Sequence, residues 1–194
     1  MKWWDEQHKI YDNNNNTYNY ITNSSLNMYI DFFECLDLYI KATNILEIGI
    51  GTGRALKEMK DKNLYAVDIS EIAFNRIKDI AKTYYIENLP NNIIDLIFCN
   101  LVAQHVTDDE LNKIFKYGID SLKEDGTFLI QCADSLNKNT ESKELYDKGG
   151  KLRDIETVSK MIKNANGKIT YTTNKRYFNG GSIWWYGLHI RRVK

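Results

Sequence analysis

The chain has 194 residues, enough for one domain with a full hydrophobic core. Its 26 lysines and arginines balance 26 aspartates and glutamates, so it lacks the overall basic character that nucleic-acid binding favours. No apolar run approaches the ~20 residues of a membrane span, and the first residues contain no signal-peptide core. Composition therefore predicts a cytoplasmic protein without a membrane partner, and it argues against nucleic acid as a substrate.

The cysteines and histidines give no sign of a metal or a disulfide framework. Cys35, Cys99 and Cys132 are far apart and form no Cys-x-x-Cys pair. Cys99 and Cys132 fall in predicted buried strands, so we expect reduced core thiols. The three histidines show no metal-ligand spacing, and we predict no metal site.

Residues 1–23 are predicted to form an arm ahead of a single domain over 24–194. The arm carries several aromatic residues among polar ones and an Asn-rich tract over 12–16, which is typical of a loop. Ser24 or Ser25 can then cap a helix that runs to about Lys41. Its apolar residues fall at helical spacing and predict one broad core-facing side: Met28, Tyr29, Phe32, Phe33, Leu36 and Ile40.

The stretch 44–56 is the most informative in the chain. Ile45, Leu46 and Ile48 read as a short buried parallel strand, and a strong helix-forming segment begins at Arg54. Between them lie three glycines at alternate positions, 49, 51 and 53, which permit positive φ and close approach of a ligand to the backbone. A dinucleotide fingerprint, Gly-x-Gly-x-x-Gly, would need glycine at position 54.

A carboxylate, Glu47, precedes these glycines at the end of the strand. A carboxylate suits a cationic ligand and opposes a pyrophosphate. The sequence Glu47-x-Gly49-x-Gly51-x-Gly53 resembles motif I of the class I S-adenosylmethionine (SAM) methyltransferases, in their small bacterial form. The resemblance implies SAM as cofactor, with Glu47 and the three glycines among its contacts. A tight strand–helix turn without a ligand is the alternative interpretation.

The second strand is predicted over 64–69 and contains Asp68 near its end, with Ser70 capping a helix over 72–82. In nucleoside-binding α/β folds a carboxylate at this place accepts hydrogen bonds from ribose hydroxyls, and the resemblance assigns that role to Asp68. A second helix cap is the alternative.

A third strand is predicted over 84–86. There the family often has an acidic residue near adenine where this chain has Tyr85, so we expect the backbone at Tyr85–Ile86 and aromatic stacking to hold adenine.

The fourth strand is predicted over 95–99, and the segment after it resembles motif IV of the family with its downstream histidine. The resemblance places cofactor contacts at Asn100 and Leu101. Thr107 to Glu110 forms a capping box, followed by a helix over 110–122 with four inward residues: Leu111, Ile114, Phe115 and Ile119. A fifth strand is predicted over 127–132, so the resemblance runs from about residue 44 to residue 133.

The last third of the chain predicts a polar loop over 133–150, a helix over 154–165 and two strands over 168–177 and 182–193. Phe178-Asn-Gly-Gly181 between these strands is a strong hairpin signal. Five α/β units followed by an antiparallel hairpin is the arrangement of class I methyltransferases. The predicted fold is therefore α/β: a Rossmann-like seven-stranded sheet flanked by helices, with a C-terminal antiparallel hairpin.

The resemblance implies direct displacement at the sulfonium methyl group of SAM, a reaction in which the protein mainly orients the reactants. An oxygen or nitrogen nucleophile can also need a base. His105 is the best candidate base, although it can equally be a structural histidine; His189 and His8 are weaker candidates. The resemblance further suggests that the aromatic arm, with Trp3, Trp4, Tyr11 and Tyr18, is a lid over the cofactor; a docked arm is the alternative.

The methyl acceptor is predicted to be a small molecule such as a sugar, a sugar nucleotide or a secondary metabolite, because the chain is short and has no net charge. Two alternatives stay open. Gln104-His105-Val-Thr-Asp108 and Arg153-Asp154 are similar to segments of the α-N-terminal protein methyltransferases. A non-catalytic SAM-binding protein is the other.

Overall fold

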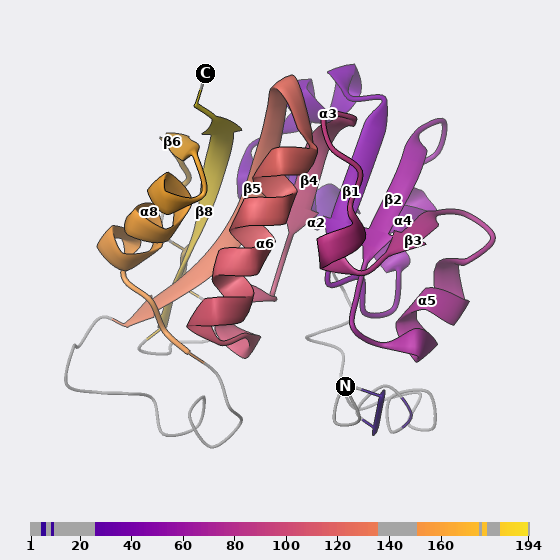
Figure 1. Cartoon of the computed structure of the whole chain (residues 1–194), viewed down its shortest axis with the longest axis horizontal. Coiled ribbons are helices and arrows are strands. Elements are labelled where there is room, and N and C mark those ends of the chain that lie inside the picture. Colours follow the sequence, from indigo (N-terminus) through magenta and orange to yellow (C-terminus); the bar gives the residue numbers. More distant parts are fainter. Residues whose placement is uncertain are drawn as a thin grey trace.

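A mixed β-sheet forms the centre of the molecule (Figure 1). The computed structural model describes residues 5–6, 9, 26–135, 151–174, 176–177 and 183–193. The described strands are β1 (Asn44–Ile48), β2 (Asn63–Val67), β3 (Lys82–Tyr84), β4 (Ile94–Cys99), β5 (Leu122–Ser135), β6 (Gly167–Thr172), β7 (Arg176–Tyr177) and β8 (Ile183–Arg192).

The strand order is β3-β2-β1-β4-β5-β8-β6, with the short β7 also paired to β8. The five strands from β3 to β5 are parallel, whereas β8 runs antiparallel to β5, β6 and β7. This order confirms the predicted Rossmann-like seven-stranded sheet with a terminal antiparallel pair; the two-residue β7 adds an eighth strand within the described residues. The chain order reverses between β1 and β4, and in open α/β sheets ligands bind at the carboxyl ends of the strands at such a point.

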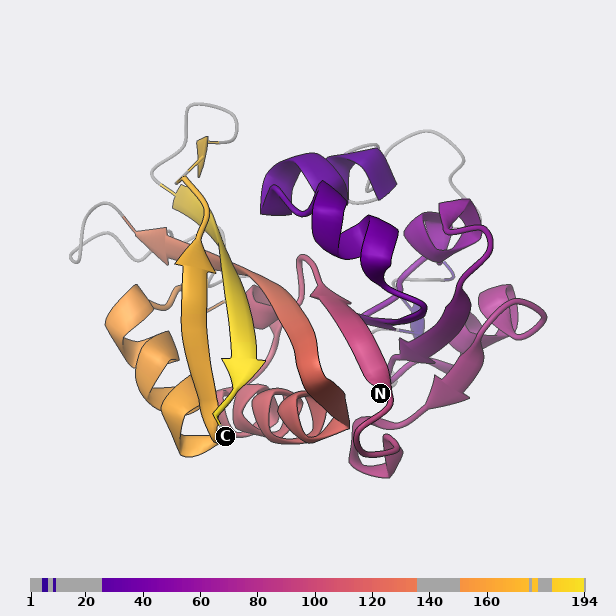
Figure 2. The ribbon, with the colours of Figure 1, turned by 90° about the horizontal axis from the view of Figure 1, so that it is seen from above.

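Helices cover both faces of the sheet (Figure 2). The described helices are α2 (Leu26–Phe33), α3 (Leu36–Lys41), α4 (Arg54–Glu58), α5 (Glu71–Ile77), α6 (Asp108–Ser121) and α8 (Ile155–Asn164), with 3₁₀ turns η1 (Ile86–Asn88) and η2 (Ala103–His105). Helices α6 and α8 lie on one face, and α2 and α3 lie on the other. Alternate residues of β1 therefore join different cores: Leu46 packs in the α6 and α8 core, and Ile45 packs with α2 and α4.

The predicted helix from Ser24 or Ser25 to Lys41 is wrong in one respect: it is two helices, α2 and α3. Glu34 has a left-handed φ of 52°, and the Cys35 N–H donates to the Ile30 carbonyl at 3.1 Å. This is the geometry of a Schellman C-cap, which usually has glycine where this chain has Glu34.

The predicted core face is only partly buried, because Met28 lies on the exposed side of α2 and the break redirects the residues after it. Tyr29, Phe32 and Phe33 are in the core as predicted. The other three apolar residues of the predicted face are exposed: Met28, Leu36 and Ile40. A single helical period cannot describe two helices whose axes differ, so the predicted core face is correct only for part of α2.

Most other predicted elements are confirmed, with shifted ends. Ser70 caps α5, whose helix ends at Ile77, before the predicted position 82, because Lys82 already pairs with Tyr65 in the sheet. The capping box before α6 and its four inward residues are confirmed. All three cysteines are buried free thiols. The described helices include none that is both long and apolar enough to cross a membrane.

Several predictions fall on residues outside the described ranges. These are the arm aromatics Trp3, Trp4, Tyr11 and Tyr18, the hairpin turn 178–181 and most of the predicted loop, 136–150. The division into an arm (1–23) and a domain (24–194) therefore stays a prediction.

Candidate functional site

The three glycines after β1 form a loop at the carboxyl edge of the sheet. Gly49, Gly51 and Gly53 have φ of 77°, 53° and 68°, a region that side chains disfavour. A Cβ on Gly49 would lie 2.2 Å from Val102 Cγ2, and one on Gly53 would lie 2.2 Å from Ile77 Cγ2. A Cβ on Gly51 would meet no atom of the described structure within 4 Å. Two glycines thus serve packing, and Gly51 presents an open backbone face that a ligand can approach.

Asp68 braces this loop from the end of β2. Its Oδ2 accepts the Gly51 N–H at 3.2 Å, and its Oδ1 accepts the N–H groups of Ile69 and Ser70 at 2.8 and 3.0 Å. From the other side, Arg76 Nη1 donates to the Gly51 carbonyl at 2.9 Å. Asp68 is half-buried, so the same carboxylate can brace the loop and accept hydroxyl donors.

Glu47 is buried beneath the loop, only 2% exposed. The Tyr29 hydroxyl of α2 donates to its Oε1 at 2.6 Å, whereas Oε2 has no hydrogen-bond partner within the described structure. Burial raises the pKa of this carboxyl to about 8. Tyr29 was predicted only as a core residue, because nothing local in the sequence links it to a carboxylate eighteen positions later.

The turn after β4 packs directly against the glycine loop. Val102 fills the space that a side chain on Gly49 would occupy. Leu101 has a positive φ of 58°, and its N–H donates to the buried Gln131 Oε1 of β5 at 2.9 Å. Asn100, half-buried, follows Cys99 at the end of β4. The structure therefore brings the predicted contacts after β1 and β4 together, and it adds Gln131, which carried no sequence signal.

His105 ends the η2 turn that follows. Its ring is half-buried, and its backbone N–H donates to the Val102 carbonyl at 2.8 Å. Burial lowers the pKa of the imidazole below its ordinary value, so the ring is neutral at pH 7. A neutral imidazole at the carboxyl edge of a parallel sheet can accept a proton.

Tyr85 and Ile86 lie at the same edge, one strand further out. Tyr84 pairs with Val67, so Tyr85 follows β3 as Asp68 follows β2. Tyr85 is 40% exposed, and its ring meets the Phe74 ring edge-to-face with 5.6 Å between the ring centroids. Its hydroxyl donates a hydrogen bond to Glu71. Two neighbours went unnoticed in the sequence: Phe74 on α5, and Ile69, which is 47% exposed beside Asp68.

His189 has a different environment from His105. His189 on β8 is buried, with Nε2 2.7 Å from the Phe33 carbonyl, so it joins β8 to the end of α2. His8 lies outside the described residues.

One residue of the arm does reach the edge: Ser70 Oγ donates to Asp5 Oδ1 at 2.5 Å. The described residues include no group of three or more histidine, cysteine or acidic side chains placed to hold a metal ion.

Comparison with known proteins agrees with this arrangement. A family model described as "Methyltransferase domain" matches residues 46–130. No curated protein matches the chain. Among solved structures, the N-methyltransferase NodS from Bradyrhizobium japonicum WM9, in complex with S-adenosylhomocysteine, aligns over 98% of this chain and 99% of its own at a TM-score of 0.71 and 13% identity.

Two further structures show how widely this fold is used. The mitomycin 7-O-methyltransferase MmcR aligns over 89% of this chain at a TM-score of 0.63 and 16% identity, and the alignment spans 55% of MmcR. The [4+2]-cyclase SpnF aligns over 87% of this chain and 79% of its own at a TM-score of 0.68 and 11% identity. At such identities the likeness concerns the fold. The family model covers the glycine loop, Asp68 and His105, so residues 46–130 are similar to a methyltransferase domain, and the strand order agrees with the fold of the solved methyltransferases.

Proposed function

We propose that this enzyme transfers the methyl group of SAM to an oxygen or nitrogen atom of a small molecule. The observation that carries the proposal is the open face of Gly51, flanked by Asp68 and followed along the same sheet edge by the turn with His105. A backbone face kept free of side chains beside a hydrogen-bonding carboxylate suits a nucleoside ligand. The cofactor contributes a methyl group already activated by its sulfonium.

The residues at this edge fit the parts of SAM. Asp68 accepts hydrogen bonds from the ribose hydroxyls while it braces the loop. Ile69, Tyr85 and Ile86 supply apolar and aromatic surface for adenine at the ends of β2 and β3. Oε2 of Glu47 is buried without a partner in the described structure, and once the carboxyl is ionised this atom would accept a hydrogen bond from the ammonium group of the cofactor. The backbone at Asn100 and Leu101 closes the pocket on the β4 side.

The protein's part in the reaction is orientation and proton removal. The neutral ring of His105 takes the proton that the acceptor hydroxyl or amine loses as it is methylated. Because burial lowers the pKa of this ring, it is ready to act at neutral pH without first losing a proton. His105 is placed by a turn that contacts the glycine loop through Val102, which suits a base that must meet a bound methyl donor.

The α-N-terminal protein methyltransferases are the alternative for the acceptor. In this chain three of the residues that carry that similarity have structural partners: Arg153 pairs with Asp108, and Asp154 caps α8. That part of the shared pattern is thus accounted for without a peptide substrate, and we retain the small-molecule acceptor.

The test separates the acceptor classes. Purified enzyme is incubated with methyl-labelled SAM and, in parallel, with the heat-treated small-molecule filtrate or the protein fraction of a bacterial lysate. We expect label in the filtrate together with S-adenosylhomocysteine, and loss of both with His105→Gln. Label confined to protein would favour the alternative, and no turnover with either fraction would favour a non-catalytic SAM-binding protein.

A further inference from the structure

Arg153 is a buried cation that the reaction described above does not use. It is 6% exposed and precedes α8. Its Nε and Nη2 contact Asp108 Oδ1 at 2.9 and 2.8 Å. Its backbone is fixed as well: the N–H donates to the Ala133 carbonyl at 2.9 Å, and the carbonyl accepts the Tyr186 hydroxyl at 3.0 Å. The guanidinium therefore projects from a backbone position that is anchored to both β5 and β8.

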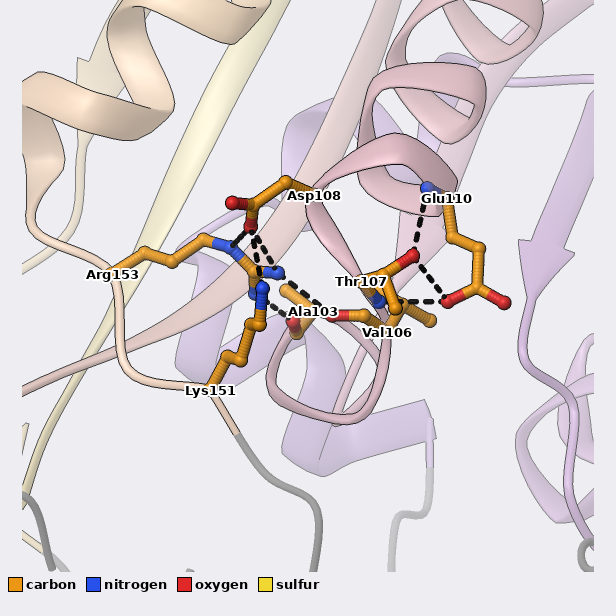
Figure 3. A network of polar contacts seen from close by, with 7 residues as sticks. All are labelled: Ala103, Val106, Thr107, Asp108, Glu110, Lys151 and Arg153. Carbon is orange, nitrogen blue, oxygen red and sulfur yellow. Dashed lines mark hydrogen bonds and ion pairs between the residues drawn. The ribbon is translucent and has the colours of Figure 1, made fainter. Parts of the chain in front are cut away.

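The remaining donors of Arg153 reach the η2 turn on both sides of His105 (Figure 3). Nη1 donates to the Ala103 carbonyl at 2.5 Å and Nη2 to the Val106 carbonyl at 2.7 Å. Close by, the Lys151 N–H donates to the Gln104 carbonyl at 2.6 Å. Segment 151–153 thus satisfies carbonyls throughout the turn. A single 3₁₀ turn has poor internal hydrogen-bond geometry, so such outside donors decide its conformation.

We propose that Arg153 is a positioning residue that fixes the η2 turn, and with it the His105 ring, at the methyl-transfer site. This rests on the proposed role of His105. The guanidinium makes these contacts from three separate nitrogens in one plane, and the single nitrogen of a lysine cannot reproduce that spread. Asp108 supplies the countercharge that a buried arginine needs, and Arg153 in turn lowers the pKa of the Asp108 carboxyl.

The capping box that follows the η2 turn provides a matched control. Thr107 and Glu110 form a capping box that begins α6. Figure 3 shows this box beside the Arg153 contacts, with its own separate hydrogen bonds. Removing Thr107 Oγ1 disturbs the helix start without removing a donor to the Ala103 or Val106 carbonyls. Thr107→Ala should therefore lower stability through the lost helix cap and leave the His105 ring in place.

The experiment follows the histidine ring by NMR in the full-length protein labelled with ¹⁵N-histidine. The His105 signal is assigned by its loss in His105→Gln, and its titration is compared in the native protein, Arg153→Lys, Arg153→Gln and Thr107→Ala. The native ring should titrate below the ordinary value of about 6.5. We expect both Arg153 variants to raise the pKa toward that value, because a released turn exposes the ring to water. Thr107→Ala should titrate as the native protein does.

Arg153→Lys retains the positive charge, so a shift in this variant reports lost geometry rather than lost charge. S-adenosylhomocysteine affinity should be unchanged in Arg153→Lys, because the glycine loop is untouched. A native titration in Arg153→Lys, or an equal shift in Thr107→Ala, would overturn the proposal. If Arg153→Gln does not fold, Arg153→Lys decides alone. If His105→Gln still turned over, His105 would not be the general base. The titrations would still show whether Arg153 fixes the position of the His105 ring.

Discussion

Glu47 gives the sharpest stability prediction, because its carboxyl is buried and only half satisfied. Folding raises its pKa from 4.5 to about 8. The folded state then binds the proton more tightly than the unfolded chain. The unfolding free energy is therefore greatest at pH values below the pKa of the unfolded chain, and it falls as the pH rises to the pKa of the folded state. At 1.36 kcal/mol per pKa unit, the unfolding free energy drops by up to ~5 kcal/mol across this window.

The perturbation is Glu47→Gln, which keeps the shape of the side chain and removes the titration. Urea unfolding is measured in the absence of cofactor at a series of pH values from about 5 to about 8, the window set by the two pKa values. The native protein should lose stability as pH rises, and the Glu47→Gln variant should lose much less, so that it is the more stable protein at pH 8. Tyr29→Phe should push the pKa of Glu47 higher, because it removes the hydrogen bond to Oε1 that favours the ionised carboxyl. Parallel pH profiles for the native protein and Glu47→Gln would refute a buried, protonated Glu47.

Three further predictions concern the cofactor edge. Gly51→Val should abolish S-adenosylhomocysteine binding in calorimetry while the domain stays folded, at a strain cost of ~1–2 kcal/mol for the positive φ; retained affinity would contradict close approach at Gly51. Asp68→Ala should weaken binding by ~1–3 kcal/mol, the scale of hydrogen bonds to a charged group, and an unchanged dissociation constant would remove its ribose role. The arm should be protected from protease by S-adenosylhomocysteine, and deletion of residues 1–20 should leave a folded domain that binds weakly; the Ser70–Asp5 contact already places Asp5 at this edge, and a truncated protein that binds normally would show that the arm is no lid.

Local signals in the sequence were sufficient for the central part of this fold. Gly49, Gly51 and Gly53 could be placed because their spacing requires a strand before them and a helix after them, and both are found. The capping box at Thr107 was readable because both partners lie within three residues. The alternation of strands and helices with a final hairpin predicted a parallel sheet that ends in antiparallel strands, as the structure has it.

Features that depend on distant partners could not be read in the same way. The helix break at Glu34 is hidden because the position lacks the glycine that usually marks it. Tyr29 and Glu47 are separated by eighteen residues, and Arg153 and Asp108 by forty-five, and no local periodicity connects either pair. In both cases the sheet topology brings the partners together, so the contact follows from the fold and not from a motif.

Binding of the cofactor to the purified protein tests the central claim most directly. Calorimetric titrations with S-adenosylhomocysteine and with NAD, under identical conditions, compare the two ligand classes that a strand, glycine loop and helix can hold. The glycine spacing after Glu47 and the open face of Gly51 predict one S-adenosylhomocysteine bound per chain and no detectable NAD. NAD binding tighter than S-adenosylhomocysteine would contradict the account.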